Sequence, residues 1–198
     1  MSYGLRRAAS IAGAAAVIVI AGTALSPAME VEGVKVPDEV KLGESGPALV
    51  LNGAGVRTRV FFRVYVGALY LERKKTAADA VLTDKGAKRV AMHLLRDLTA
   101  EQLFSALEEG LKNNHDPAEL ARLEPQTRQL EGIFGAVKAV KAGDSILIDY
   151  TPGGGTRIVV NGELRGTIPG DDFNRALLRI WLGERPADTA LKKAMLGG

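Results

Sequence analysis

Alternation of apolar and polar residues is strongest from Val56 to Glu72, in the segment VRTRVFFRVYVGALYLE. A period of two over this length predicts a β-strand. Between Arg57 and Val66 there is no Gly, Pro, Asn or Asp to make a turn, so we expect one continuous strand. Arg57 and Tyr65 would then lie about 26 Å apart along it, at the usual rise per residue.

Other segments show shorter β patterns. The alternating stretch before Pro37 predicts an edge strand. A second apolar run stops at Asn52-Gly53-Ala54-Gly55, which is typical of a turn, and Asn161-Gly162 is a strong hairpin signal. The expected additional strands are Val31–Val36, Ala48–Leu51, Lys88–Leu98, Ser145–Thr151, Thr156–Val160 and Glu163–Ile168.

Helix signals separate these strands. Thr99 to Gln102 forms a capping box, and Asp116 followed by Pro117 predicts an N-cap with proline in the first turn. The expected helices are a short one from Thr76 to about Leu82, one after Thr99, one after Asp116 that Pro125 restarts, one from Asp171 to Gly183, and one from Pro186 to Leu196. This order predicts an α+β fold in which an antiparallel sheet is covered by helices on one face.

The N-terminus has the three parts of an export signal. Arg6-Arg7 is followed by the apolar stretch Ile11–Leu25 and by the small residues Ser26-Pro27-Ala28. The apolar stretch is shorter than the roughly 20 residues of a membrane span. We expect residues 1–28 to be a signal peptide, residues 29–198 to form one domain, and the protein to be periplasmic or secreted. An uncleaved single-pass anchor is the alternative.

Composition narrows the chemistry. The 198-residue chain has no Cys and two His, which excludes disulfides, thiolate metal sites and a cysteine nucleophile. Without residues 1–28 it has 24 basic and 23 acidic residues, so no nucleic-acid partner is expected. We expect no metal and no cofactor, and a membrane contact only through the signal segment if it is uncleaved. His93 is interpreted as a half-exposed structural histidine rather than a general base, because no partner is identifiable.

Two segments, NGAGVR at 52–57 and FRVYVGALYLE at 62–72, carry a family pattern. They resemble the chalcone isomerase superfamily, and most of all its bacterial chalcone isomerase-like branch. The resemblance covers roughly residues 30–197. It implies an open-faced β-sandwich, in which a long antiparallel sheet carries helices on one face and a ligand cleft lies between the two layers.

The resemblance also assigns positions. In the plant isomerases an arginine holds the attacking phenolate, and Arg57 matches it. Other polar positions of those enzymes fall on Tyr65, Leu103, Gly110 and the pair Ile180-Trp181. Ring closure needs donors aimed at the developing enolate, and most of these side chains have none to offer. An intramolecular lyase of the chalcone–flavanone type is therefore an alternative rather than the main hypothesis.

An apolar cleft with a charged mouth suits an amphiphilic carboxylate such as a fatty acid. The plant fatty-acid-binding branch of the superfamily uses an arginine and a tyrosine for the head group, and Arg57 and Tyr65 are the candidates here, with Arg63 as a substitute. The expected ligand-binding set is Arg57, Tyr65, Arg63, Leu103, Phe104, Leu107 and Trp181.

Three functions thus remain open, and the structure can favour each in a different way. An unpaired Arg57 over an empty apolar cavity favours a non-catalytic binding protein. A Tyr or His near Arg57 at that cavity favours an isomerase. A cleft plugged by Trp181 and Phe104 favours a structural or partner-binding module.

Overall fold

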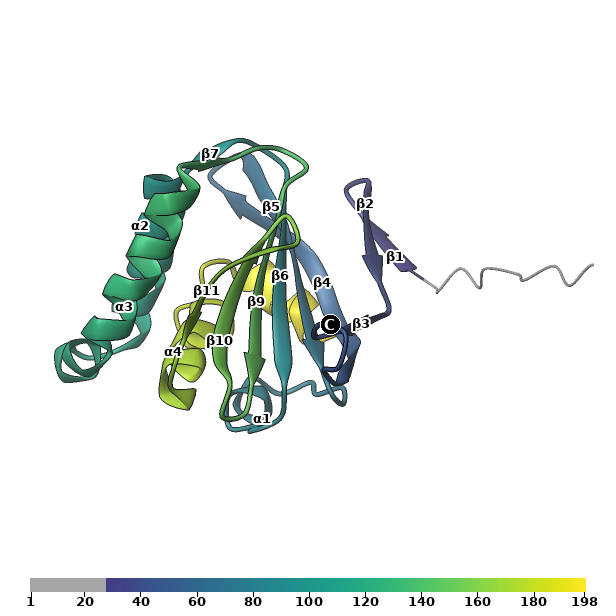
Figure 1. Cartoon of the computed structure of the whole chain (residues 1–198). Helices are drawn as coiled ribbons and strands as arrows, with labels where there is room; N and C mark the ends of the chain where they lie inside the picture. Colours follow the sequence, from purple (N-terminus) through teal and green to yellow (C-terminus); the bar gives the residue numbers. More distant parts are fainter. Residues whose placement is uncertain (1–27) are drawn as a thin grey trace, which may run out of the picture.

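The computed structural model describes residues 28–198, and the predicted signal segment falls outside them except for Ala28. A seven-stranded antiparallel sheet in the order β11-β10-β9-β6-β5-β4-β3 forms the centre of the molecule (Figure 1). Its strands are β3 (Glu39–Lys41), β4 (Ala48–Arg59), β5 (Phe62–Leu71), β6 (Lys88–Leu94), β9 (Ser145–Thr151), β10 (Gly155–Val160) and β11 (Glu163–Ile168).

The helices pack on one face of this sheet, as Figure 1 shows. They are α1 (Ala78–Leu82), α2 (Ala100–Asn114), α3 (Pro117–Val137), α4 (Asp171–Leu182) and α5 (Thr189–Met195). The larger apolar cluster lies between the sheet and the helices, around Leu69, Met92, Phe134 and Trp181. The predicted α+β fold with helices on one face is confirmed.

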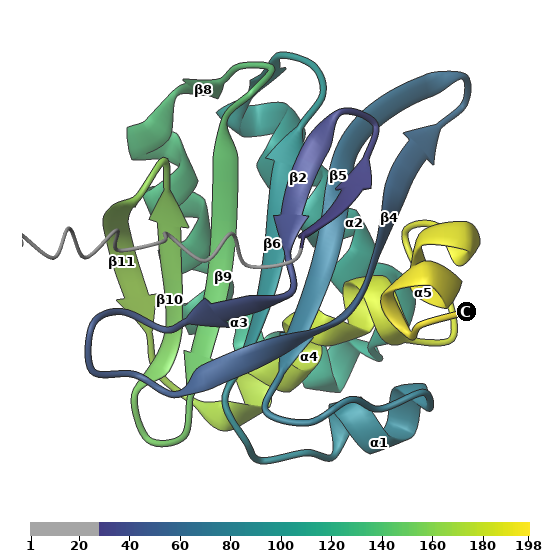
Figure 2. The same ribbon diagram turned by 90° about the vertical axis from the view of Figure 1, so that its right-hand side faces the viewer.

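A small hairpin lies against the opposite face (Figures 1 and 2). It consists of β1 (Ala28–Val31) and β2 (Val34–Pro37), joined by a turn in which Glu32 and Gly33 both have positive φ. Val36 is fully buried there in a second apolar cluster. The prediction of one strand over Val31–Val36 is wrong, because the alternation continues through a two-residue turn.

The long strand predicted from Val56 to Glu72 is also wrong. The chain reverses at Val60-Phe61, and β4 and β5 form an antiparallel hairpin. Val60 has φ +59°, a left-handed conformation that is unusual for a β-branched residue. Alternation has the same period on both strands of a hairpin, so it gives no sign of a turn made without glycine or asparagine.

The predicted turn at residues 52–55 is, conversely, part of β4. Its glycines are required by α5, which crosses the strand at very short range. A Cβ on Gly53 would lie 2.1 Å from the carbonyl oxygen of Ala194, and one on Gly55 would lie 2.6 Å from the Ala194 Cβ. These glycines therefore allow helix–strand contact and do not bend the chain.

Two of the predicted helix starts are confirmed. Thr99 and Asp116 both form complete capping boxes. Pro125, however, lies inside a continuous α3 and does not restart it. The short helix α1 has Ala77 as its N-cap, without a side-chain bond, so the cap predicted at Thr76 is absent.

Helices α2 and α3 are inserted between two adjacent strands, β6 and β9. The two short strands β7 (Leu98–Thr99) and β8 (Ala139–Val140) pair at the base of this insert. Below them, the backbone of Leu94 bonds to Gly143 and Asp144, each at 2.8 Å. The insert thus leaves and returns at neighbouring points.

Candidate functional site

Arg57 and Tyr65 lie directly opposite each other in the β4–β5 ladder. The Arg57 Cζ is 5.7 Å from the centroid of the Tyr65 ring, a cation–π distance. The separation of about 26 Å expected for a single strand is therefore wrong, because the turn at Val60-Phe61 brings the two residues together. The sheet thus unites the head-group pair that the resemblance implied.

The Tyr65 hydroxyl lies inside the protein and is held by Trp181. The indole Nε1 of Trp181 donates a hydrogen bond of 2.8 Å to the Tyr65 oxygen. Burial raises the pKa of Tyr65 above its ordinary value of 10, and the Arg57 charge and the Trp181 hydrogen bond offset part of that rise. The phenol therefore stays neutral at neutral pH, and its proton can be donated.

Arg57 as a whole residue is partly exposed, but its Nε is buried and has no hydrogen-bond partner among the described residues. Asp188, whose charge also raises the pKa of Tyr65, is occupied elsewhere. Its two oxygens accept from the backbone N–H groups of Thr58 and Leu191, both at 2.9 Å. A buried hydrogen-bond donor without an acceptor raises the free energy of the folded state. An acceptor supplied by a ligand would therefore be stabilised at Arg57.

Asp188 is not among the residues that the sequence predicts at this site. It caps α5 and ties that helix to β4 beside Arg57. Its position immediately before Thr189 fits the N-cap preference for Asp, and that signal was available in the sequence. The bond from Thr58 depends on the tertiary fold.

The apolar residues expected to line the ligand cleft belong to the main apolar cluster between the sheet and the helices. Leu103, Leu107 and Trp181 are buried in one cluster with Tyr65, and Phe104 is partly buried against it. Gly110 belongs to the same contact, since a Cβ there would lie 2.6 Å from Ile180 Cγ2. This apolar region is therefore filled by the protein's own side chains in this conformation.

Arg63 is not part of this arrangement. Its side chain is exposed and forms an ion pair with Glu32 in the turn between β1 and β2. The structure therefore brings together Arg57, Tyr65 and Trp181, places Leu103, Phe104 and Leu107 in or against the same core cluster as Tyr65, and leaves Arg63 outside.

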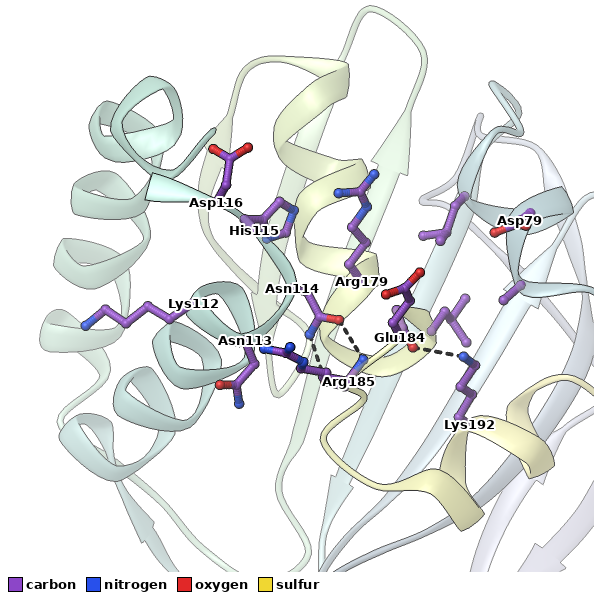
Figure 3. Close-up of a pocket in the computed structure, with 14 residues that line it drawn as sticks. Asp79, Lys112, Asn113, Asn114, His115, Asp116, Arg179, Glu184, Arg185 and Lys192 are labelled. Atoms are coloured by element: carbon purple, nitrogen blue, oxygen red, sulfur yellow. Dashed lines mark hydrogen bonds between the residues drawn. The ribbon is translucent and has the colours of Figure 1, made fainter. Parts of the chain in front are cut away.

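A surface hollow lies elsewhere, between the C-terminal ends of α2 and α4 and the helix α1 (Figure 3). It has a volume of about 500 Å³ and is lined mostly by polar and charged side chains, including Lys112, Arg179 and Arg185. Asn114 spans it, donating to the Arg185 carbonyl at 2.8 Å and accepting from the Arg185 N–H at 3.0 Å. We interpret these bonds as a structural link between two loops.

Within residues 28–198, no cluster of three or more His, Asp or Glu side chains is arranged to hold a metal ion. In the same part of the chain, no helix combines the length and apolar character needed to cross a membrane.

Comparison with known proteins gives the family. A sequence profile described as chalcone isomerase-like matches residues 28–197. The chain belongs to the chalcone isomerase-like family. Among solved structures, it is similar to a fatty-acid binding protein of Arabidopsis thaliana, with a TM-score of 0.57 and 15% identity over 80% of this chain and 95% of that one. No curated protein matches it significantly in sequence.

At 15% identity the structural similarity establishes the fold alone. In this chalcone isomerase-like chain, two positions that the resemblance matched to polar groups are Leu103 and Gly110. The first is buried in the apolar cluster and the second is closely packed against Ile180. Neither side chain can supply a donor for ring closure.

His93 lies on the other face of the sheet from Tyr65, in register with Val66 and Ser145. Burial lowers its pKa from 6.5. The folded protein thus binds this proton more weakly than the unfolded chain, so the contribution of His93 to stability is fully present above pH 6.5 and is lost as the pH falls below it. We expect His93→Gln to reduce this loss of stability between pH 7 and pH 5, as measured by urea unfolding.

The control for that experiment is His115→Gln, which removes a histidine at the end of α2. A pH dependence in His93→Gln equal to that of the unmodified protein would contradict the prediction.

Proposed function

We propose that this chalcone isomerase-like protein is exported, as a periplasmic or secreted member of the bacterial branch, and binds a small amphiphilic carboxylate such as a fatty acid without transforming it. The observation that carries the proposal is Arg57, a cation whose buried Nε has no hydrogen-bond partner within residues 28–198 and whose guanidinium lies over the ring of Tyr65, a member of the main apolar cluster.

The chemistry of the pair fits a carboxylate head group. Arg57 can donate a charge-assisted hydrogen bond to the carboxylate, and the neutral Tyr65 hydroxyl can donate a second, uncharged one. Each methylene of an acyl chain buried beside Leu103 and Leu107 would contribute about 0.8 kcal/mol. The similar Arabidopsis structure carries the name of a fatty-acid binding protein, which supports this class of ligand.

The export part of the proposal rests on the N-terminal pattern of Arg6-Arg7 followed by an apolar segment. Expression of the full chain in a bacterial host tests it. We expect the protein in the periplasmic or secreted fraction with a mass that begins near Met29. Full-length protein in the cytoplasm would contradict export.

A second function is favoured by the bond between Trp181 and Tyr65. Together with the buried apolar cluster it closes the space where an acyl chain would lie. A structural or partner-binding module would have a cleft closed in this way permanently. Under the binding proposal, the side chains around the partly exposed Phe104 must move to admit the ligand.

Ligand content distinguishes the two functions. Native mass spectrometry of the exported protein, followed by organic extraction, should show a bound carboxylate or uptake of added palmitate. We expect Arg57→Ala to weaken that binding by roughly 10- to 100-fold, because one charged hydrogen bond is lost. Arg63→Ala, on the same hairpin but outside the site, is the matched control and should bind as the unmodified protein does.

An empty protein that also ignores palmitate would contradict the binding proposal and favour the closed module. Turnover of an added chalcone, lost in Arg57→Ala, would favour the intramolecular lyase instead.

A further inference from the structure

The tip of the β4–β5 hairpin exposes three consecutive apolar side chains. Val60, Phe61 and Phe62 are 77%, 91% and 61% exposed. The backbone of this hairpin extends beyond α5 at the upper right of Figure 2. Val60 also has the left-handed backbone conformation that disfavours a β-branched residue. Exposure of these three side chains to water therefore gives the turn neither apolar burial nor a favourable backbone conformation.

Arginines surround this tip. Arg59 and Arg63 flank it in sequence, and the Arg96 Cζ lies 5.0 Å from the centroid of the Phe62 ring. Arg59 and Arg63 are each paired with a glutamate in an exposed ion pair, with Glu109 at 3.4 Å and with Glu32 respectively.

Exposed ion pairs of this kind are weak and exchange easily with other anions. Arg96 has no carboxylate within 4 Å among residues 28–198. The rim of the apolar tip can therefore contact several anionic groups at once.

We infer that this tip is a membrane-docking element that inserts Val60, Phe61 and Phe62 into the interface of an anionic phospholipid bilayer. Apolar side chains gain by entering the boundary between head groups and acyl chains, and adjacent arginines gain by lying at the level of the phosphates. Composition gave no reason to expect a membrane contact beyond the N-terminal segment. The surface does, because the apolar and basic residues are gathered at one projecting point.

The size of the patch favours a bilayer over a protein partner. A stable protein interface buries about 800 Å² of polar and apolar surface on each side and needs a partner of complementary shape over that whole area. Two phenylalanines and a valine supply at most about 600 Å², since a large aromatic side chain buries 150–250 Å². A bilayer needs no complementary surface, so a small tip with a basic rim is sufficient.

The inference does not depend on the proposed ligand. Arg57 lies only two residues before Arg59 on the same strand. Docking would therefore place the proposed head-group site near the bilayer surface, but it requires only the tip and its rim.

The lack of cysteine allows a direct test on the full chain. Phe61→Cys provides a single thiol for an environment-sensitive nitrobenzoxadiazole label at the tip. Leu164→Cys is the matched control, because Leu164 is also an exposed apolar residue, at 49%, but lies on β11 at the far edge of the sheet. Each labelled protein is mixed with phosphatidylcholine vesicles that either contain or lack phosphatidylglycerol.

We expect the label at position 61 to show a several-fold rise in fluorescence and a blue shift with the anionic vesicles only, and the label at 164 to show neither. Adding Arg96→Glu to Phe61→Cys should weaken vesicle binding by about tenfold. Each basic residue near an anionic surface strengthens binding by about fivefold, and the substitution also adds a negative charge. Higher salt should weaken it as well.

Attachment through the N-terminal segment alone would leave both labels in water and would overturn the inference. An equal response to neutral vesicles would overturn it too. A change at position 61 that follows protein concentration without vesicles would assign the tip to a second copy of the chain instead.

Discussion

Gly53→Ala is expected to lower the unfolding free energy by about 3 kcal/mol and to loosen α5. The new methyl group would lie 2.1 Å from the Ala194 carbonyl oxygen, so the helix must move away from β4. That movement exposes Leu191 and Met195, the two buried residues of α5. Thermal unfolding should show a decrease in Tm of roughly 10 °C for a chain of this size. Hydrogen exchange should quicken in α5 before it does elsewhere.

Gly132→Ala is the matched control. This glycine lies on the exposed side of α3, where a Cβ would meet nothing within 4 Å. Helix propensity alone then applies, and the change should raise the unfolding free energy by up to about 1 kcal/mol. A Gly53→Ala protein as stable as the unmodified one would mean that α5 does not press on the strand as the structure shows.

Trp181→Ala is expected to have the largest effect on stability of any single change discussed. It removes the largest of the fully buried side chains and should lower the unfolding free energy by about 4 kcal/mol, from loss of packing and the cavity left behind. It also removes the donor to the Tyr65 hydroxyl. Urea unfolding monitored by circular dichroism measures the change without relying on tryptophan fluorescence.

A double-mutant cycle isolates the hydrogen bond. Tyr65→Phe leaves the buried Trp181 N–H without an acceptor and should lower the unfolding free energy by about 2 kcal/mol. Trp181→Phe leaves the hydroxyl without its donor. The double variant should lose clearly less than the two single effects combined, because no orphaned polar group then remains. Strict additivity would contradict a direct bond.

Local signals in the sequence predicted local structure well. Thr99 and Asp116 cap helices where expected, and Asn161-Gly162 turns the β10–β11 hairpin. In each of these motifs the residues that determine the conformation lie within a few positions of one another. Their neighbours in sequence are sufficient to identify them.

The site depended on signals that the sequence does not display. The turn at Val60-Phe61 has no glycine, asparagine or proline, so the alternation predicts one strand and a large separation between Arg57 and Tyr65, which in fact face each other. The bond between Tyr65 and Trp181 joins residues 116 positions apart, which no local pattern encodes.

The glycines at 52–55 were misinterpreted for a related reason. Positions 53 and 55 require glycine because α5, from the far end of the chain, crosses the strand there and leaves no room for a Cβ. A glycine that permits close packing and a glycine that makes a turn look alike in a single sequence.

The pinned base of the α2–α3 insert has a consequence for how the fold can vary. Without it, β4, β5, β6, β9, β10 and β11 would follow one another as a simple meander, each strand next to its neighbour in sequence. Because the pairing of β7 with β8 and the bonds at Leu94 close the insert off, its length and composition can change without shifting the register of any strand. The two inserted helices can thus diversify independently of the sheet that carries Arg57 and Tyr65.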